Sequence, residues 1–451
     1  MARPRLPRQR GRRGSASVRS PACGRGRVRG GPHPARGRPA AHGRGRHGGR
    51  GRLMLPLEGI RAVDLSRNIA GPLCTMLLGD LGAEVVKVER PDGGDEARNH
   101  AAESGVSPYF AALNRNKRSM CLDLKDPEGA RALAALLRRS DVLVDNFRPG
   151  ALGRLGFRDE RLEREFPHLV VCHISGFGRT GPWAQAAAYD HIIQGFSGLM
   201  SLTGPAGEGG YRTNTSVADI VAGLFAATTV VASLRGRERG ERTGAHDDGQ
   251  GGDIVHVSLL AGLLNALCYQ AATYLTTGEA AAPTGNQHPY IVPYGTYATR
   301  NGLVNVCVGN DRLFGRFCKT LGLPDLISDE RFGSNTARVR NRDPLNELVE
   351  PALAARTSEK WLAAFREEGI PCGPVHTLPE ALAHPQVEAL GLVTRVEDGA
   401  GGHFRHLGPP FESGRLTGVI RRRPPLLGEH TAEILAELAE DSARQGSEGN
   451  R

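Results

Sequence analysis

The chain has 451 residues, and its apolar content of 39% includes no uninterrupted apolar run of about 18 residues, so we expect no membrane span. The net charge of +10 is uneven, because residues 1–53 contain 16 arginines and no acidic residue, which leaves 42 basic and 48 acidic groups in the rest. The body of the chain is therefore mildly acidic and has few aromatic residues, which argues against a general nucleic-acid binder.

Cysteine usage points to a reducing compartment. Eight cysteines are scattered along the chain without a CxxC pair, most of them in apolar surroundings. This pattern favours buried free thiols over a disulfide framework or a zinc site. We therefore expect a cytoplasmic protein without a metal centre.

Residues 1–53 consist mainly of Arg, Gly, Pro and Ala and cannot bury enough surface to fold alone. Three interpretations stay open. The segment is an RNA-binding tail, a transit peptide that would place the protein in the mitochondrial matrix, or a non-native extension ahead of a true start at Met54. The many glycines and prolines argue against a transit peptide, which needs an amphipathic helix, and we favour the start at Met54.

From Leu55 on, predicted strands and helices alternate. Apolar periodicity and turn signals predict strands over residues 59–65, 83–89, 120–124, 141–144 and 170–175, and helices over 70–78 and 126–139. Strand, helix and strand within about 30 residues form a βαβ unit, which implies parallel strands. The first turn has one glycine and not GxGxxG, so the dinucleotide fingerprint is absent.

The segment from Val170 to Leu224 carries the candidate chemistry. It contains a short strand, a Gly-Phe-Gly turn and two acidic residues, Asp190 and Asp219, separated by residues rich in Gly, Ser and Thr. Small side chains there permit close backbone approach to a ligand. Asp219 comes just before a long apolar stretch that predicts a buried helix.

The second half of the chain predicts a smaller, separate unit. A charged, glycine-rich loop (235–252) is followed by an apolar stretch (254–267) and a turn-rich loop (284–289). Two strands (291–298 and 303–308) and helical segments (311–321 and 343–367) come next. A rigid connector (369–375) and a last helix (430–440) complete this half. These strands lie far in sequence from the first sheet, which suggests a second domain.

Taken together, the motifs indicate a family. They are DLSRNIAGP, GAEVVKVERP, NRNKRSMCLDL, DNFRPGALGRLGF, ISGFGRTGP, AAYD, TSVAD, GNQHP, GIPCGPV and PPLLGEH. With these motifs in this order, residues 55–440 resemble the class III CoA-transferase family, which includes formyl-CoA, carnitine and dicarboxylate CoA-transferases and α-methylacyl-CoA racemase.

The resemblance implies roles for particular residues. The catalytic aspartate of the family falls on Asp219, and its tyrosine-acidic pair falls on Tyr189 and Asp190. Its CoA contacts fall on Asn68, Ile69, Ala70, Arg90, Leu122, Asn146, Phe147 and Arg154. The loop that covers the acyl group falls on Gly285, Asn286, Gln287 and His288.

The resemblance also implies an α/β fold. A Rossmann-like, parallel-sheet large domain (54–270) would be followed by an inserted small α+β domain (276–360), and residues 361–440 would form the connector and return to the large domain. Two chains would form an interlocked homodimer. Coenzyme A would be a substrate and carrier, with no tightly bound cofactor.

The implied reaction moves CoA from an acyl-CoA to a carboxylic acid through an aspartyl anhydride and an aspartyl-CoA thioester. An aspartate with an ordinary pKa of about 3.9 is ionised at pH 7 and needs no base. Each site residue also has a structural interpretation: Asp219 as a helix cap, Tyr189 and Asp190 as a solvated turn, and Arg212 as a surface charge in place of a partner for the acceptor carboxylate.

Two departures narrow the choice within the family. The racemase needs a histidine base where this chain has Tyr189, so we favour CoA transfer. Formyl-CoA transferase has a glutamine in place of Ile69 and several glycines in place of Gly285–His288, which disfavours a formyl or oxalate substrate. We expect a small dicarboxylate acceptor and succinyl-CoA as the donor.

Overall fold

The computed structural model describes residues 55–100, 107–239, 252–397, 403–411 and 420–448. Its main sheet has six parallel strands in the order β3-β2-β1-β4-β5-β6. The strands are β1 (Arg61–Asp64), β2 (Glu84–Glu89), β3 (Lys117–Cys121), β4 (Val142–Asp145), β5 (Val170–Ser175) and β6 (Asp253–Ser258). This order is that of a doubly wound dinucleotide-binding sheet. The predicted parallel-sheet α/β architecture is confirmed.

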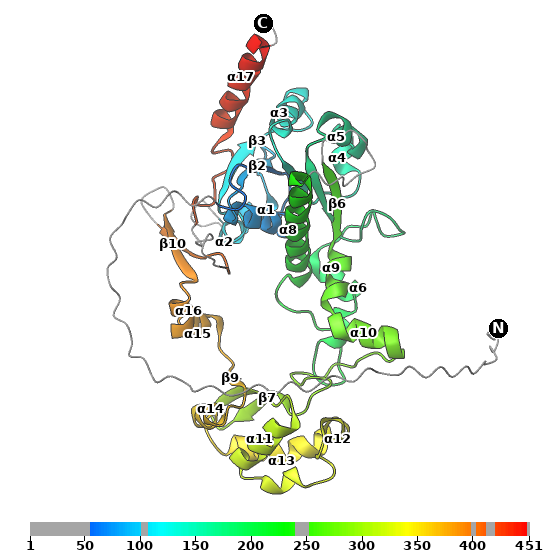
Figure 1. Ribbon diagram of the computed structural model, residues 1–451, viewed down its shortest axis with the longest axis vertical. Coiled ribbons are helices and arrows are strands. Elements are labelled where there is room, and N and C mark those ends of the chain that lie inside the picture. The colour runs from blue at the N-terminus through cyan, green and yellow to red at the C-terminus, as the bar shows by residue number, and fades with distance from the viewer. Residues whose placement is uncertain (1–54, 101–106, 240–251, 398–402, 412–419, 449–451) are drawn as a thin grey trace, which may run out of the picture. The chain divides into compact units, whose positions relative to one another are not determined.

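Helices cover both faces of this sheet because successive strand residues point to opposite sides. Ala62 and Val85 belong to one hydrophobic cluster and Val63 and Val86 to another. The first cluster includes α1 (Ala70–Asp80), α6 (Asp190–Phe196), α8 (Val217–Glu238) and α9 (Leu259–Ala266). The second includes α3 (Pro127–Leu137), α4 (Ala151–Arg154), α5 (Asp159–Glu165) and α17 (Thr431–Glu448). Figure 1 shows α8 beside α1 and β6.

Helix α8 is, among the described residues, the one long and apolar enough to cross a membrane by length and composition. It packs against α1, α9, β5 and β6 in the first hydrophobic cluster. The approach to α1 is close: a Cβ on Gly223 would lie 2.7 Å from the carbonyl oxygen of Ala70. Glycine at this crossing lets the two helices touch.

A third hydrophobic cluster surrounds the antiparallel sheet β7-β8-β9. Its strands and helices are β7 (Tyr294–Thr299), β8 (Gly302–Cys307), β9 (Cys372–Pro374), α11 (Asp311–Leu321), η2 (Pro324–Ile327), α12 (Asn335–Arg340), α13 (Arg342–Ala354) and α14 (Ser358–Glu367). Trp361 and Phe365 of α14 are buried in this cluster. The packing of this cluster therefore continues beyond residue 360, into the first part of the segment expected to be a connector, as far as Cys372.

The remaining short elements lie between strands of the main sheet, lead to the second sheet or follow it. Before β7 these are η1 (Glu96–Asn99), α2 (Pro108–Ala111), α7 (Leu199–Leu202) and α10 (Cys268–Thr277). After β9 they are α15 (Leu378–Leu382), α16 (Pro385–Ala389) and the hairpin of β10 (Val393–Glu397) and β11 (His403–Leu407). The described cysteines are all free thiols, and no group of metal-ligating side chains occurs in the same residues.

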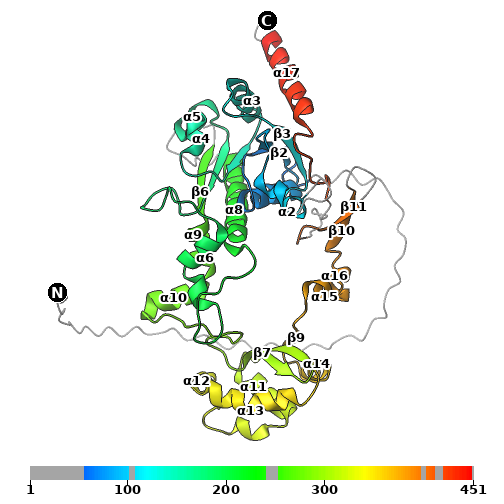
Figure 2. The same ribbon diagram turned by 180° about the vertical axis from the view of Figure 1, so that it is seen from behind.

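The last helix returns to the edge of the main sheet, where α17 lies beside β3 in both views (Figure 1, Figure 2). The backbone amide of His430 donates to the carbonyl oxygen of Ser119 at 2.9 Å, and the amide of Cys121 donates to Oγ1 of Thr431 at 2.9 Å. Arg118 adds an ion pair of 2.7 Å to Glu437. The C-terminal residues thus cover the open side of the edge strand.

Three predicted elements differ from the observed ones. Lys117 and Arg118, which precede the strand predicted over 120–124, are buried residues of β3. Helix α8 begins at Val217, so Asp219 lies in its first turn and not ahead of it. The helix predicted over 343–367 is two helices, and the break lets the indole of Trp361 donate to the carbonyl oxygen of Leu353 at 2.7 Å.

Candidate functional site

The loops that follow β1 and β4 meet where the strand order reverses, the usual ligand-binding position in an open α/β sheet. Asn146, after β4, accepts a hydrogen bond from the amide of Arg67 at 2.8 Å and donates one to the carbonyl oxygen of Arg67 at 2.7 Å. Arg67 also lies over the ring of Phe147, 5.2 Å from its centroid. Two of the predicted CoA contacts, Asn146 and Phe147, are therefore joined to the loop that holds Asn68, Ile69 and Ala70.

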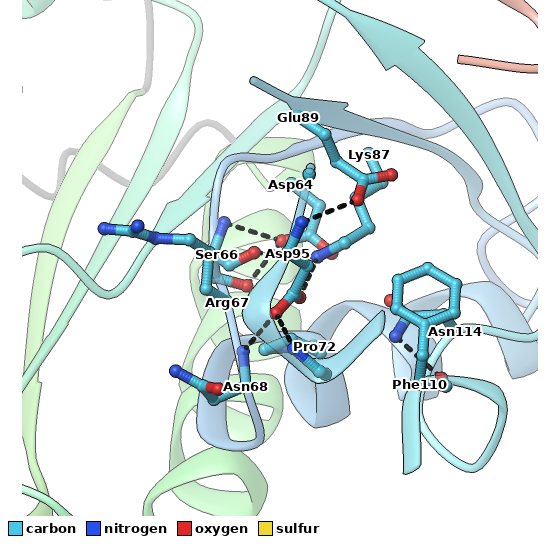
Figure 3. Close-up of polar contacts among 12 residues, drawn as sticks. Asp64, Ser66, Arg67, Asn68, Pro72, Lys87, Glu89, Asp95, Phe110 and Asn114 are labelled. Atoms are coloured by element: carbon cyan, nitrogen blue, oxygen red, sulfur yellow. Dashed lines mark hydrogen bonds and ion pairs between the residues drawn. The ribbon is translucent and has the colours of Figure 1, made fainter. Parts of the chain in front are cut away.

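Asn68 holds a left-handed backbone conformation with φ of 63°. Its amide donates to Oδ1 of Asp95 at 3.0 Å, and Asp95 forms an ion pair of 2.9 Å with Lys87 (Figure 3). A non-glycine residue in this conformation is uncommon and must be held there by its surroundings. The Asp95 carboxylate is such a restraint on the loop before α1.

Behind this loop, two lysines and two aspartates form a buried network. Asp64 lies 2.9 Å from Nζ of Lys117 and 3.8 Å from Nζ of Lys87. Burial alone would raise the pKa of Asp64, but the two ammonium groups outweigh it and hold that pKa well below its usual range. Burial and the charge of Lys87 lower the pKa of Lys117 to about 8, against the attraction of Asp64. The network joins the ends of β1 and β2 to β3.

The other three predicted CoA contacts differ in how exposed their side chains are. Arg90 follows β2, and its guanidinium is half-exposed and lies 3.4 Å from Glu96. Arg154 ends α4 and is exposed. Leu122 is buried in the second hydrophobic cluster, so it offers a ligand its backbone and not its side chain.

A histidine missed by the sequence analysis supports the loop after β4. His173 of β5 lies 2.6 Å from Oδ2 of Asp145 and 3.3 Å from Oδ1 of Asp159. Burial alone would lower its pKa, but the two carboxylates raise the pKa of His173 to about 10. Oδ1 of Asp145 accepts the amide hydrogen of Phe147 at 3.0 Å. The imidazolium thus helps fix the turn that carries the predicted CoA contacts.

The two candidate catalytic carboxylates lie close together. Asp190 begins α6 and is 7% exposed, and its Oδ1 accepts the amide hydrogen of Ala218 at 2.8 Å. Ala218 is in the first turn of α8, next to Asp219. The helix amide is therefore used by Asp190, whereas the sequence suggested that Asp219 would cap this helix.

The environment of Asp219 changes its acidity. Burial first, and the negative charge of Asp190 second, raise the pKa of Asp219 to about 7. The expectation of an ordinary aspartate, fully ionised at pH 7, is therefore wrong, because desolvation and a like charge both disfavour the anion. A carboxylate with this pKa is a stronger nucleophile than an ordinary one and is about half ionised at pH 7.

Gln194 positions Asp190, and the sequence analysis missed it. Its Nε2 donates to Oδ2 of Asp190 at 2.6 Å, and its Oε1 accepts the amide hydrogen of Thr213 at 2.9 Å. The side chain is fully buried and connects α6 to the loop that leads into α8. Its position one helical turn after Asp190 was the available sequence signal.

The two tyrosines near this site differ in exposure. Tyr189 is 71% exposed at the start of α6. Tyr109, on α2, was not predicted, yet burial and the charges of Asp219, Asp95 and Asp190 raise the pKa of Tyr109. Its phenol therefore lies within electrostatic reach of both candidate catalytic carboxylates, and no local motif around it would have revealed this.

The predicted lid, residues 285–288, is fastened to β7. The amide of His288 donates to the carbonyl oxygen of Tyr294 at 2.8 Å, and Gln287 forms a β-bridge with Gly295. Gly285 has φ of 60° and lies against Ala206, in the segment between Asp190 and Asp219. The loop thus contacts the candidate catalytic segment through the turn at 205–207.

The arrangement combines a nucleophile with a binding surface. Asp219 lies one turn before Gly223, which packs on Ala70, so the carboxylate is near the loop that holds three predicted CoA contacts. A thioester bound along that loop would present its carbonyl to a carboxylate of raised pKa. The chemistry that fits is acyl transfer to an aspartate.

Comparison with known proteins agrees with this chemistry. Residues 57–431 match CoA-transferase family III. The chain is 38% identical over 408 residues to the succinyl-CoA:glutarate CoA-transferase of Mus musculus, which covers 89% of this chain and 92% of that protein. It is 37% identical over 392 residues to the acetyl-CoA:oxalate CoA-transferase of Acetobacter aceti, covering 86% of this chain and 97% of that protein.

Solved structures show the same fold. A CAIB/BAIF family protein from Brucella suis matches with a TM-score of 0.74 and 34% identity, covering 85% of this chain and all of that chain. The family match spans most of the chain, and it includes both loops of the switch point and both candidate catalytic aspartates. This protein therefore belongs to CoA-transferase family III and is an enzyme of that class.

Proposed function

We propose that this enzyme transfers coenzyme A from succinyl-CoA to a small dicarboxylic acid, with Asp219 as the nucleophile. The observation that carries the proposal is the raised pKa of Asp219, in the first turn of a core helix beside Asp190. A structural cap would be expected to keep its carboxylate ionised by accepting helix amides. Here a neighbouring aspartate accepts the amide, and Asp219 is left basic.

The first half-reaction attaches CoA to the enzyme. The ionised Asp219 attacks the thioester carbonyl, the carbon–sulfur bond breaks, and a mixed aspartyl–acyl anhydride and CoA thiolate form. The thiolate then attacks the aspartyl carbonyl and releases the donor as a free carboxylate. The acceptor carboxylate repeats both steps in reverse, which restores Asp219 and yields the new thioester. Both intermediates hydrolyse readily, so the site must exclude water, and the loop 285–288 is suited to that role.

The residues around the nucleophile have supporting roles. Gln194 and the amide of Ala218 hold Asp190 in place, and the negative charge of Asp190 helps to raise the pKa of Asp219, which makes its carboxylate more basic. The loop at Asn68, restrained by Asp95, and the loop at Asn146 would position the pantetheine and nucleotide. Held geometry of this kind is worth roughly 7–11 kcal/mol in an oriented acyl transfer.

The choice of acids rests on relatives and on charge. Proteins at 38% and 36% identity are succinyl-CoA:glutarate CoA-transferases of Mus musculus and Homo sapiens. The acetyl-CoA:oxalate CoA-transferase of Acetobacter aceti is 37% identical, so identity alone does not distinguish glutarate from oxalate as the acceptor. A dicarboxylate needs a cation for its second carboxylate, and Arg212 is an exposed cation in the segment between the catalytic aspartates.

A second copy of the chain would complete the enzyme. Large apolar side chains stay exposed on neighbouring helices α8, α9 and α10: Leu224, Phe225, Leu264, Tyr269 and Leu275. Large apolar side chains exposed on helices that contact one another are the kind of surface that an obligate interface buries. We therefore propose a homodimer, and a monomer by light scattering at micromolar concentration would contradict it.

The decisive experiment traps the intermediate. With acyl-CoA present, hydroxylamine should convert Asp219 to a hydroxamate that peptide mass spectrometry locates, and Asp219→Ala should show neither the label nor transfer. Screening a panel of CoA esters and acids should give the highest kcat/KM with succinyl-CoA and a dicarboxylate. Near-normal transfer by Asp219→Ala would refute the mechanism. Exchange of an α-proton without CoA transfer would identify a racemase instead.

The acceptor cation can be tested separately. Arg212→Gln should raise KM for a dicarboxylate acceptor about tenfold and change KM for a monocarboxylate little, because only the former would use the guanidinium. Asn214, which accepts a hydrogen bond from Arg212 at 3.1 Å, offers the control Asn214→Ala. Equal effects of Arg212→Gln on both acceptors would remove this residue from acceptor recognition.

A further inference from the structure

The loop 285–288 is held to β7 by its own hydrogen bonds. The carbonyl oxygen of Asn286 accepts the amide hydrogen of Thr296 at 3.2 Å, and the hydroxyl of Tyr297 donates to Oε1 of Gln287 at 3.3 Å. These bonds attach the loop to the second sheet, whereas Asp219 lies on α8, which packs on the main sheet. A further contact is therefore needed to hold the loop near the nucleophile.

The side chain of His288 makes such a contact. Its imidazole lies nearly parallel to the ring of Tyr269 on α10, with the ring centroids 5.9 Å apart and the planes at 24°. This separation is within the range of favourable aromatic pairs, about 4.5–7 Å. Helix α10 contacts α9, and α9 packs against α8, which carries Asp219 in its first turn. The ring of His288 therefore joins the loop to the helices behind the nucleophile.

The surroundings of His288 fix the orientation of this ring. The ring of Tyr294 lies 4.9 Å from it, and its Nδ1 accepts the amide hydrogen of Tyr290 at 3.1 Å. The carbonyl oxygen of His288 accepts a hydrogen bond from Nη2 of Arg342 at 2.8 Å. Burial first, and the charge of Arg342 second, lower the pKa of His288, so the imidazole is neutral at pH 7 and its Nδ1 can accept. Contacts with β7, α13 and the intervening loop thus hold the ring toward Tyr269.

A second contact supports the same placement of the loop. The amide of Gly207 donates to the carbonyl oxygen of Pro283 at 3.1 Å, just ahead of the loop. Gly207 belongs to the segment between Asp190 and Asp219. This bond joins two backbones, so no substitution of a side chain removes its partners. The stack of His288 on Tyr269 is made by side chains and can be removed.

We propose that His288 is a positioning residue, which through its stack on Tyr269 holds the loop 285–288 where it keeps water from the aspartyl intermediates. The inference rests on the proposed function, in which Asp219 carries first the acyl group and then CoA. Water that reaches the aspartyl-CoA thioester adds to its carbonyl carbon, and the carbon–sulfur bond breaks. The products are the Asp219 carboxylate, the CoA thiol and one proton. The stack therefore sets how the intermediate divides between hydrolysis and transfer.

The test compares the two fates of the intermediate, with the acyl-CoA and acid that give the highest kcat/KM in the panel. Release of CoA thiol without the acceptor measures hydrolysis, and formation of the new thioester with the acceptor measures transfer. The rate of thiol release with Asp219→Ala is subtracted, because thioesters also hydrolyse in solution. Tyr269→Ala should raise the ratio of hydrolysis to transfer about tenfold, because the ring that holds His288 is lost. Tyr269→Phe retains the ring and should stay within about twofold of the parent.

A matched control comes from the same helix. Tyr274 of α10 is 55% exposed, close to the 48% of Tyr269, and has no ring contact among the residues that the structure describes. Tyr274→Ala should therefore leave the ratio of hydrolysis to transfer equal to that of the parent.

A second variant removes the other ring. His288→Asn retains an acceptor for the amide of Tyr290 but has no ring, so it should also raise the ratio about tenfold. His384→Asn is its control, because Nδ1 of His384 likewise accepts the amide hydrogen two residues later, that of Gln386, at 3.1 Å. That exchange lies outside the loop and should leave the ratio unchanged.

Hydroxylamine should still label Asp219 in Tyr269→Ala, because the nucleophile is unchanged. A ratio in folded His288→Asn equal to that of the parent, or the same increase in Tyr274→Ala as in Tyr269→Ala, would overturn the inference and leave the proposed function intact. A parent enzyme without label on Asp219 would instead overturn the proposed function, and this inference with it. Tyr269 also belongs to the surface proposed for the homodimer, so light scattering and unfolding curves accompany each variant. If Tyr269→Ala changes the molecular mass, His288→Asn decides.

Discussion

Replacing Asp190 by asparagine tests the electrostatic coupling that we assign to the two aspartates. Asp190→Asn removes the negative charge next to Asp219 and keeps the size of the side chain. The amide cannot satisfy both present partners, because it meets two donors, the amide of Ala218 and Nε2 of Gln194. We therefore expect a loss of stability of about 1–3 kcal/mol, which leaves the enzyme folded at 25 °C.

The magnitude of the pH effect follows from the two causes that raise the pKa of Asp219. That pKa increases from 3.8 to about 7, with burial as the larger cause and Asp190 as the smaller. Loss of the like charge should therefore lower the pKa of Asp219 by about 1, to roughly 6. At pH 6 the ionised fraction would increase from about 0.1 to about 0.5, a change of about fivefold in kcat/KM relative to its plateau.

The assay is the pH dependence of kcat/KM for CoA transfer between pH 5 and pH 9. The parent enzyme should lose activity below about pH 7, because the nucleophile must be deprotonated, and the variant should lose it about one pH unit lower. Glu208→Gln removes an exposed carboxylate from the same segment and should leave the profile unchanged. An acid limb that stays within 0.2 pH (about the error of such a fit) in folded Asp190→Asn would refute the coupling.

Three further predictions concern stability and positioning. The pKa of Asp219 is higher in the folded than in the unfolded state, so its ionisation destabilises the fold as pH rises from about 4 to 7. Urea unfolding should therefore show that Asp219→Asn is about 1–3 kcal/mol more stable than the parent at pH 8 and equal to it at pH 4. Because the pKa of His173 is raised, its charge stabilises the fold fully below pH 6.5, and this stabilisation is lost as pH rises through about 10. His173→Gln should therefore lower the free energy of unfolding by about 1–3 kcal/mol at pH 6 and by much less at pH 10. The same loss at both pH values would show that the charge of His173 does not contribute. Gln194→Ala should reduce kcat at least tenfold with little change in KM for acyl-CoA, whereas Gln185→Ala, an exposed glutamine, should change neither.

The sequence predicted strands β1, β2, β4 and β5 of the main sheet well, because each has a short apolar, β-branched run that is bounded by turns. The predicted CoA contacts at Asn68 and Asn146 follow strand ends, and parallel strands bring such ends to one edge. Where the periodicity is weaker, the predicted elements differ from the observed ones. The apolar stretch predicted over 254–267 is strand β6 followed by helix α9. The division into domains and the interlocked dimer stay predictions.

What the sequence could not predict depends on partners far away in the chain. Lys117 is a charged residue whose burial depends on partners such as Asp64, 53 residues earlier, and the carbonyl oxygen of Pro72. The histidine at 173 becomes an imidazolium through Asp145 and Asp159, which come from two other elements. The acidity of Asp219 likewise depends on desolvation, which no local pattern records. Motifs identify which residues take part, and tertiary contacts set their charge.

The return of the C-terminal residues to β3 has a consequence for biosynthesis. β3 is an edge strand of the main sheet, and the groups that cover it lie at Gly428, His430 and Thr431, of which Thr431 comes 310 residues after its partner Cys121. A ribosome must therefore add about 310 residues after β3 before that edge is protected. Until then the nascent protein presents an open strand to its neighbours, which favours edge-to-edge association.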